Sequence, residues 1–213
     1  NTLQTRVPTA QDISHDPSRN QAATPQPGDP DYLEPAQDKV FADPPPPAHT
    51  GGFGEPNCTF CHFGNAYPSG GSVTVETPST YSPGSTVAIR VTIADTSAGR
   101  QRWGFELSAR FRNGTQAGSF ANGPDVRVQV ERGIQYAAHS PSVRQPGNSF
   151  TYTVMWTAPA DASGGDVLFH AAGNASNNDG SQNGDRIFTT PAAGVVSLAP
   201  TATPARVLAG GIV

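Results

Sequence analysis

The sequence predicts an all-β fold, an antiparallel immunoglobulin-like β-sandwich preceded by a long, irregular, proline-rich N-terminal tail. Three observations support this. Apolar and polar residues alternate in several short runs after residue 70, turn-forming segments separate these runs, and the region up to residue 190 contains no convincing helix pattern. Alternation with a period of two gives a strand one buried and one solvated face. Short strands separated by turn signals are typical of a sandwich, with a barrel as the second choice.

The predicted tail spans residues 1–50. It contains ten prolines, including the run Pro44–Pro47, and no window of it shows helical or alternating apolar periodicity. Proline fixes φ and removes a backbone donor, so this segment cannot build a packed element of its own. Its composition is typical of a disordered or polyproline-type segment.

The sandwich is predicted over residues 51–190, and a C-terminal extension over residues 191–213. The predicted strands are, in chain order, residues 72–76, 85–95, 103–111, 150–156 and 166–172. The apolar faces of the three longest runs are predicted to be Val87, Ile89, Val91 and Ile93, then Phe105, Leu107, Ala109 and Phe111, then Phe150, Tyr152, Val154 and Trp156. A sandwich of about 100 residues is typical, so the length suits one such domain.

The stretch EPNCTFCHFGN contains both cysteines of the chain, Cys58 and Cys61, and His62 directly after the second. C-x-x-C-H is the attachment signature of c-type haem, in which the thiols form two thioethers and the histidine is the proximal iron ligand. Two thiols three residues apart on a tight turn can reach both vinyl groups of a porphyrin, and the next residue then places its imidazole beneath the iron. We therefore expect one covalent haem c, bound by Cys58 and Cys61, with His62 on the iron.

Other uses of the two cysteines are weaker. A redox dithiol usually opens a helix in a βαβ unit, and no helix is predicted there. A structural zinc site needs four ligands, and the sequence has no second cysteine pair. A small structural disulfide stays open as an alternative.

A six-coordinate haem also needs a ligand on the far side of the iron. The candidates are His15, His49, His139, His170 and Met155. His170 and Met155 lie on the polar faces of their predicted strands. His49 stands nine residues before Cys58 in a Pro/Gly-rich loop, and His139 ends a predicted strand.

Five blocks of sequence carry a family resemblance. In order, they are HTGGFGEPNCTFCHFG, YSPGSTVAIRVTI, GFELSA, QYAAHS and MWTAPADASGGDVLFHAAGNASNNDGSQNGDRIFT. Together they resemble the bacterial surface domain called choice-of-anchor V, a relative of the reeler-like β-sandwiches, over about residues 50–190. The resemblance implies an exported, cell-surface protein on an immunoglobulin-like sandwich, often with a C-x-x-C-H. It favours His139 as the distal ligand, with His49 second, and it implies no biochemical activity.

Composition argues against several classes of function. No apolar run is long enough to span a bilayer, and a chain that starts at Asn1 without an apolar leader is expected to be a processed, exported chain. A net charge of −4, a single lysine and no dense Lys/Arg face argue against nucleic-acid and anionic-membrane partners. Hydrolase motifs such as G-x-S-x-G and H-E-x-x-H are missing, so we expect no enzyme.

The loop of residues 173–185 is rich in Asn, Asp and Gly. Asp179, Asn183 and Asp185 could bind Ca²⁺, which takes oxygen ligands from loops. The spacing does not match an EF-hand, and a polar loop whose side chains bond their own backbone is the favoured interpretation.

The haem motif predicts an extracytoplasmic monohaem c-type cytochrome, extracellular, at the cell surface or in the periplasm, that carries electrons to an unidentified redox partner. One alternative is a structural or adhesive filament protein in which haem iron is mainly a staple. Another is a haem sensor or peroxidase with an open axial site.

The tail also predicts self-assembly. Fifty residues in polyproline-like extension span about 150 Å, whereas a sandwich of this size has a radius of gyration of about 15 Å. The tail can therefore cross to a neighbouring copy and pair with an exposed sheet edge, and a head-to-tail contact of this kind generates filaments. We expect a homo-oligomer or filament, with residues 40–50 as the hinge and residues 205–213 at an interface. A tail folded back on its own domain is the alternative.

Overall fold

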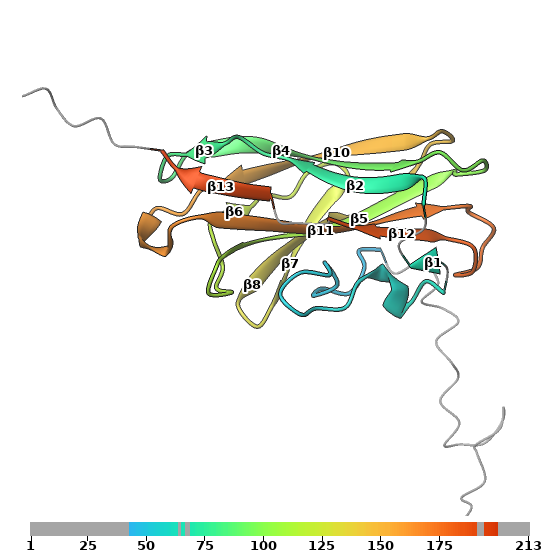
Figure 1. Cartoon of the computed structure of the whole chain (residues 1–213), viewed down its shortest axis with the longest axis horizontal. Coiled ribbons are helices and arrows are strands. Elements are labelled where there is room, and N and C mark those ends of the chain that lie inside the picture. Colours follow the sequence, from blue (N-terminus) through green and yellow to red (C-terminus); the bar gives the residue numbers. More distant parts are fainter. Residues whose placement is uncertain (1–42, 64, 67–68, 191–193, 200–213) are drawn as a thin grey trace, which may run out of the picture. The chain divides into compact units, whose positions relative to one another are not determined.

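The computed structural model describes residues 43–63, 65–66, 69–190 and 194–199. These residues form two β-sheets packed face to face, one of nine strands and one of four (Figure 1). The helical segments in this part of the chain are two short 3₁₀ turns, η3 (Cys58–Phe60) and η4 (Ala162–Gly164). The predicted all-β sandwich is confirmed.

The smaller sheet has the strand order β2-β4-β10-β6, and all its pairs are antiparallel. Its strands are β2 (Gly71–Glu76), β4 (Thr86–Asp95), β6 (Ser119–Phe120) and β10 (Ser149–Thr157). β4 and β10 pair over their whole shared length, from Ser149 opposite Ala94 to Thr157 opposite Thr86. This register turns the predicted apolar faces of both strands toward the other sheet.

The larger sheet has the main order β1-β12-β11-β5-β8-β7, with β9 beside β5 and with β13 between β11 and β3. Its strands are β1 (Asn65–Ala66), β3 (Thr80–Tyr81), β5 (Arg102–Phe111), β7 (Val126–Glu131), β8 (Ile134–His139), β9 (Val143–Arg144), β11 (Val167–Ser176), β12 (Arg186–Thr189) and β13 (Gly194–Leu198). The central pair is β5 and β11, which are antiparallel over ten residues each.

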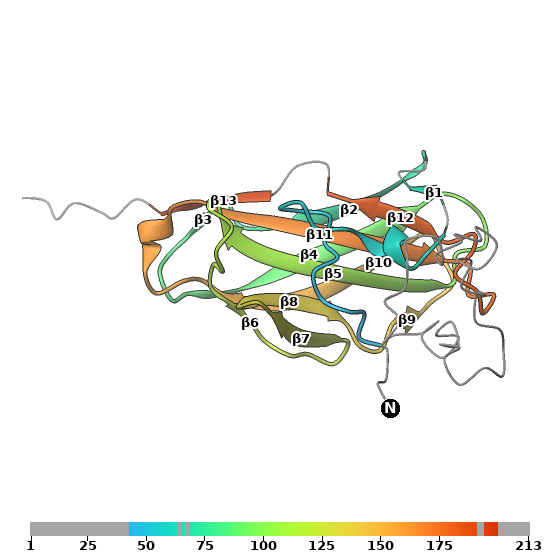
Figure 2. The ribbon, with the colours of Figure 1, turned by 90° about the horizontal axis from the view of Figure 1, so that it is seen from below.

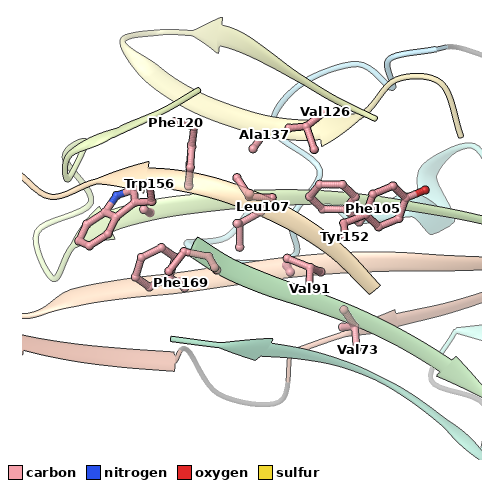
Figure 3. Close-up of a cluster of buried hydrophobic side chains, with 14 of the residues drawn as sticks. Val73, Val91, Phe105, Leu107, Phe120, Val126, Ala137, Tyr152, Trp156 and Phe169 are labelled. Carbon is pink, nitrogen blue, oxygen red and sulfur yellow. The ribbon is translucent and has the colours of Figure 1, made fainter. Parts of the chain in front are cut away.

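The core lies between the two sheets and is built mainly from aromatic and β-branched side chains (Figure 3). Phe105 of β5 packs on Tyr152 of β10 with ring centroids 4.4 Å apart, and Trp156 meets Phe169 edge to face at 5.1 Å. The polar ends of these rings are also satisfied, since the Tyr152 hydroxyl donates to the carbonyl of Trp103 at 2.7 Å. Buried aromatic rings with bonded polar groups fix the relative position of the sheets.

The outer face of β5 departs from simple alternation. Glu106, Ser108 and Arg110 point away from the core, yet at most 7% of each is exposed. They are covered by residues 43–57, called here the strap, which crosses the outer face of the large sheet over β8, β5 and β11 (Figure 2). Their burial therefore comes from a segment without regular secondary structure.

Hydrogen bonds hold the start of the strap on the sheet. The backbone N–H of Ser142 donates to Asp43 Oδ2 at 3.0 Å, and Gln129 Nε2 of β7 donates to the carbonyl of Pro45 at 2.6 Å. The backbone N–H of His49 donates to Glu106 Oε2 at 2.9 Å. Before it reaches the cysteines, the strap thus contacts β7, the connection after β8, and β5.

A buried ion pair holds the end of the strap. Glu55 Oε1 accepts hydrogen bonds from Arg110 Nη2 and, at 2.5 Å, from the Tyr136 hydroxyl, while Thr50 Oγ1 donates to Glu55 Oε2 at 2.6 Å. The guanidinium of Arg110 also lies 4.8 Å from the ring centroid of Phe53. A buried ion pair of this kind is costly to break, because the surviving partner stays buried and unpaired.

Two segments near the predicted domain limits belong to the described fold. Residues 43–50, predicted as the end of the tail and as part of its hinge (residues 40–50), bond to the sheet, and β13 lies beyond the predicted limit at residue 190. The limits of 50 and 190 themselves stay predictions, and the preceding part of the tail lies outside the described residues. Within the described part of the chain, no helix has the length and apolar character needed to cross a bilayer.

We expect Glu55→Ala to lower the free energy of unfolding by about 3–5 kcal/mol, because Arg110 would be left buried without its carboxylate. Glu76→Ala is the matched control, since Glu76 pairs with Arg90 at 3.4 Å with both side chains mainly exposed. It should cost less than about 1 kcal/mol. Urea unfolding of both variants measures the difference. Equal losses would show that the strap is not held by this pair.

Candidate functional site

The C-x-x-C-H motif folds as one tight turn, as the sequence predicts. Asn57 caps η3, since its side chain accepts a hydrogen bond from the backbone N–H of Thr59 at 2.8 Å. The N–H groups of Cys61 and His62 both donate to the carbonyl of Cys58, at 3.3 and 2.9 Å. Both cysteines are free thiols. The turn therefore gathers two thiols and an imidazole without a cross-link between the thiols.

The ring of His62 is held by a carboxylate from the far end of the chain. Its Nδ1 lies 2.7 Å from Oδ2 of Asp185, a residue that is 1% exposed. Burial acts to raise the pKa of Asp185, but hydrogen bonds from His62, Ser176 and Asn174 outweigh burial and hold that pKa below its ordinary value. An ionised carboxylate accepts the Nδ1–H, and the lone pair of His62 is then on Nε2.

His139 lies on the same outer face, at the end of β8. Its ring covers Gly104 of β5, where a Cβ would come within 2.7 Å of the His139 Cε1 atom. Gly104 pairs with Asn174 of β11, and the Asn174 side-chain nitrogen lies 3.2 Å from His62 Nδ1. Directly opposed positions of an antiparallel pair have Cβ sites about 5 Å apart. The two imidazoles therefore occupy neighbouring places on the sheet.

The surroundings of His139 suit a neutral ligand. Burial is the main cause that lowers its pKa, and the nearby charge of His62 lowers it further. The backbone N–H of Phe105 donates to His139 Nδ1 at 2.9 Å, and the carbonyl of the same residue lies 3.1 Å from that nitrogen. When Nδ1 accepts the N–H of Phe105, the ring proton is on Nε2. A metal at Nε2 would require the other tautomer, in which Nδ1–H donates to the carbonyl of Phe105.

His49, the second candidate, also lies beside the turn. Its ring centroid is 5.3 Å from that of Phe60, and its Nδ1 lies 2.9 Å from the carbonyl of Pro47. Among the described residues, no contact places His49 at the Gly104–Asn174 pair. His49 therefore lies beside the cysteine turn, whereas His139 lies beside the sheet position where Asn174 contacts His62.

The remaining candidates have other surroundings. The ring of His170 packs on Gly52 and meets Phe53 edge to face, with centroids 5.1 Å apart. Met155 lies in β10 of the other sheet and is 42% exposed. His15 lies outside the described residues.

The side chains around the thiols fit a large apolar group. Phe60 lies within the motif and Phe63 directly follows it, and their side chains are 68% and 65% exposed, which is unusual for phenylalanine. Burial raises the pKa of the Cys58 thiol to about 12. The attacking cysteine of a redox dithiol has a lowered pKa instead, so the turn is poorly suited to thiolate exchange. Exposed aromatic planes, two thiols and two imidazoles fit a covalently held porphyrin.

The oxygen-rich loop uses its polar groups internally. Asp179 Oδ1 accepts the N–H of Ser181 at 2.8 Å, and Asp185 faces His62 instead of Asp179. Within the described ranges no group of three or more His, Cys, Asp or Glu side chains gathers as a metal site. The contact between Asp185 and His62 joins residues 123 positions apart and left no local signal in the sequence.

Comparisons with known proteins found similarity to solved structures only. No family model matches the sequence, and no curated protein matches it. The chain is similar to the Reelin-N domain of F-spondin, with 20% identity, a TM-score of 0.44, and coverage of 67% of this chain and 96% of that chain. It is also similar to the human F-spondin reeler domain (21%, TM-score 0.41, coverage 64% and 93%) and to the sixth cohesin of scaffoldin B from Acetivibrio cellulolyticus (15%, TM-score 0.36, coverage 62% and 100%).

Glu106 is a buried carboxyl group beneath this site. It is 1% exposed, and its Oε1 has no hydrogen-bond partner among the described residues. Burial raises the pKa of Glu106 to about 8, against the opposing effect of backbone hydrogen bonds from His49 and Ala48. The group is therefore held in a place that favours its neutral form.

This environment predicts a pH-dependent stability. Between the ordinary pKa of 4.5 and the folded value of about 8, the folded chain holds a proton that the unfolded chain releases. The free energy of unfolding therefore falls as the pH rises through that window. In Glu106→Gln this loss is absent. Between about pH 5 and about pH 8, the free energy of unfolding of the variant should therefore rise by about 2–4 kcal/mol relative to that of the unmodified chain.

Urea unfolding at both pH values measures this difference. Glu76→Gln serves as the control, because Glu76 is mainly exposed and should leave the pH profile of the unmodified chain unchanged. Identical pH profiles for Glu106→Gln and the unmodified chain would contradict the assignment.

Proposed function

We propose that the chain is an extracytoplasmic, monohaem c-type cytochrome that transfers electrons as a subunit of a self-assembled filament. Cys58 and Cys61 would carry the haem, and His62 and His139 would ligate its iron. The observation that supports this most is that the fold brings both histidines to the Gly104–Asn174 pair, each with Nδ1 engaged by the protein. Such a group supplies reversible one-electron chemistry when bound.

The residues around the two imidazoles would set their properties. Asp185 accepts the Nδ1–H of His62, which fixes the ring and makes Nε2 more basic. The carbonyl of Phe105 can do the same for His139. Two histidine ligands give a lower potential than histidine with methionine, and Met155 lies in the other sheet. We therefore expect a low-potential electron carrier.

The position of His139 beside His62 on the sheet favours this function over a sensor or peroxidase with an open axial site, because it offers a second histidine close to the first. The exposed rings of Phe60 and Phe63 favour a second role for the same group. A haem over these rings would cover apolar surface and staple the turn to the sheet, as the structural alternative requires.

The proposal of export to the cell surface rests on the resemblance to choice-of-anchor V domains. Assembly is supported by the place where the strap starts. Pro45 bonds Gln129 of β7, which is the last strand in the order of its sheet and exposes 62% of Val130. Edge strands accept added strands from other chains. The tail residues that precede the strap would pair with a neighbour near such an edge.

His139→Ala tests the iron site. We expect the pigment to stay with the denatured chain through acid–acetone extraction, because the thioethers of Cys58 and Cys61 remain. The optical spectrum should change from low-spin to high-spin, because the far ligand is lost.

His49→Ala is the matched control and should stay low-spin. A spectrum that changes in His49→Ala but not in His139→Ala would assign the far ligand to the strap. Pigment that extracts freely, or a chain that carries none after export, would contradict the cytochrome function itself.

Deletion of residues 1–42 tests the assembly. The shortened chain keeps Asp43 and its bond to Ser142, so the strap should stay in place. We expect it to be monomeric by light scattering and to form no filaments in electron micrographs, whereas the full chain should polymerise. Filaments that persist without the tail, or a full chain that stays monomeric at high concentration, would contradict the proposal.

A further inference from the structure

Glu106 is a buried carboxyl group on the outer face of the large sheet, and the proposed haem attachment does not involve it. It lies in the middle of β5, opposite Ala138 of β8 and Ala172 of β11. The small alanine side chains leave the carboxyl group to be covered by the strap, whose His49 N–H donates to it. His49 also links Glu106 to the cysteine turn, since the centroid of the His49 ring lies 5.3 Å from that of Phe60. Burial raises the pKa of the Cys58 thiol, and the charge of Glu106 raises it further.

One carboxyl oxygen of Glu106 accepts a hydrogen bond, and the other can accept a proton. Oε2 accepts the N–H of His49 at 2.9 Å, and Oε1 has no partner within the part of the chain described. A buried carboxylate with a free oxygen is poorly stabilised and readily accepts a proton there.

The charges around Glu106 do not neutralise it. The titratable and charged groups on the elements packed around it are Asp43, His49 and Glu55 of the strap, Cys58, Cys61 and His62 of the turn, Arg102 and Arg110 of β5, Tyr136 and His139 of β8, and His170 of β11. Arg110 already pairs with Glu55 and Tyr136. An iron bound at His62 would therefore be the nearby charge that changes most.

We propose that Glu106 is a redox-linked proton site, which takes up one proton when the haem iron gains an electron and releases it when the iron loses that electron. This inference rests on the haem proposed above. Ferric haem carries one more positive charge than ferrous haem, and a nearby positive charge favours the ionised form of a carboxyl group. Loss of that charge therefore strengthens proton binding at Glu106.

One electron and one proton enter the site together on reduction. The one-electron redox partner supplies the electron to the iron, and the solvent supplies the proton to Glu106 Oε1. The proton returns to solvent when the partner removes the electron. The buried region beneath the turn keeps the same net charge in both states, which avoids the cost of an uncompensated buried charge.

Potentiometry of the haem-loaded full chain over a range of pH tests the inference. In the unmodified chain the potential should fall as pH rises through neutrality, with uptake approaching one proton per electron. In Glu106→Gln this uptake should disappear over the same range, and the potential should be higher at alkaline pH because a negative charge is gone. Glu76→Gln, a control on the other sheet, should behave as the unmodified chain.

Infrared difference spectra of the unmodified chain give a readout that needs no variant to fold. Reduction should produce the C=O stretch of a protonated carboxyl group, and Glu106→Gln should lack it. A potential with the same pH dependence in Glu106→Gln as in the unmodified chain, or no carboxyl band on reduction, would overturn this inference and leave the cytochrome function intact. A chain without covalent haem would overturn both.

Discussion

The buried contact of Glu55 with Arg110 and Tyr136 is the interaction on which the rest of the outer face depends. It fixes the end of the strap two residues before the capped cysteine turn, so it determines where the two thiols and His62 lie on the sheet. It also closes the cover over Glu106. Without it, the strap would be held mainly by the hydrogen bonds of the Asp43 carboxylate and of the Pro45 and His49 backbone, which lie farther from the turn along the chain.

The strands and the cysteine turn could be predicted because their signals are local. Alternating apolar residues in β4, β5 and β10 identify one buried face for each, and those faces form the core. The C-x-x-C-H spacing is likewise contained in five residues, and its turn is observed. Both predictions need only the period of the backbone and the chemistry of neighbouring side chains.

The remainder of the site could not be predicted, because it arises from contacts between distant segments. Asp185 was placed in a possible Ca²⁺ loop, and only the pairing of β11 with β12 brings it to His62. The polar residues of β5 look solvated in the alternation pattern, but a proline-rich segment without periodicity buries them. Gly104 gives no sign in the sequence that it makes room for His139. Periodicity predicts which residues face the same way, and it contains no information on what lies above that face.

The order of the site along the chain has a consequence for biogenesis. The cysteines belong to the first described segment, whereas Asn174 lies in β11 and Asp185 directly precedes β12, late in the sandwich. A chain that emerges from its amino end presents the cysteine segment before the strands that receive it exist. An enzyme that attached the proposed haem could therefore act on an open, extended substrate, and the folding of the later strands would then enclose that modification. In this protein the folding sheet would act as the final step of cofactor maturation.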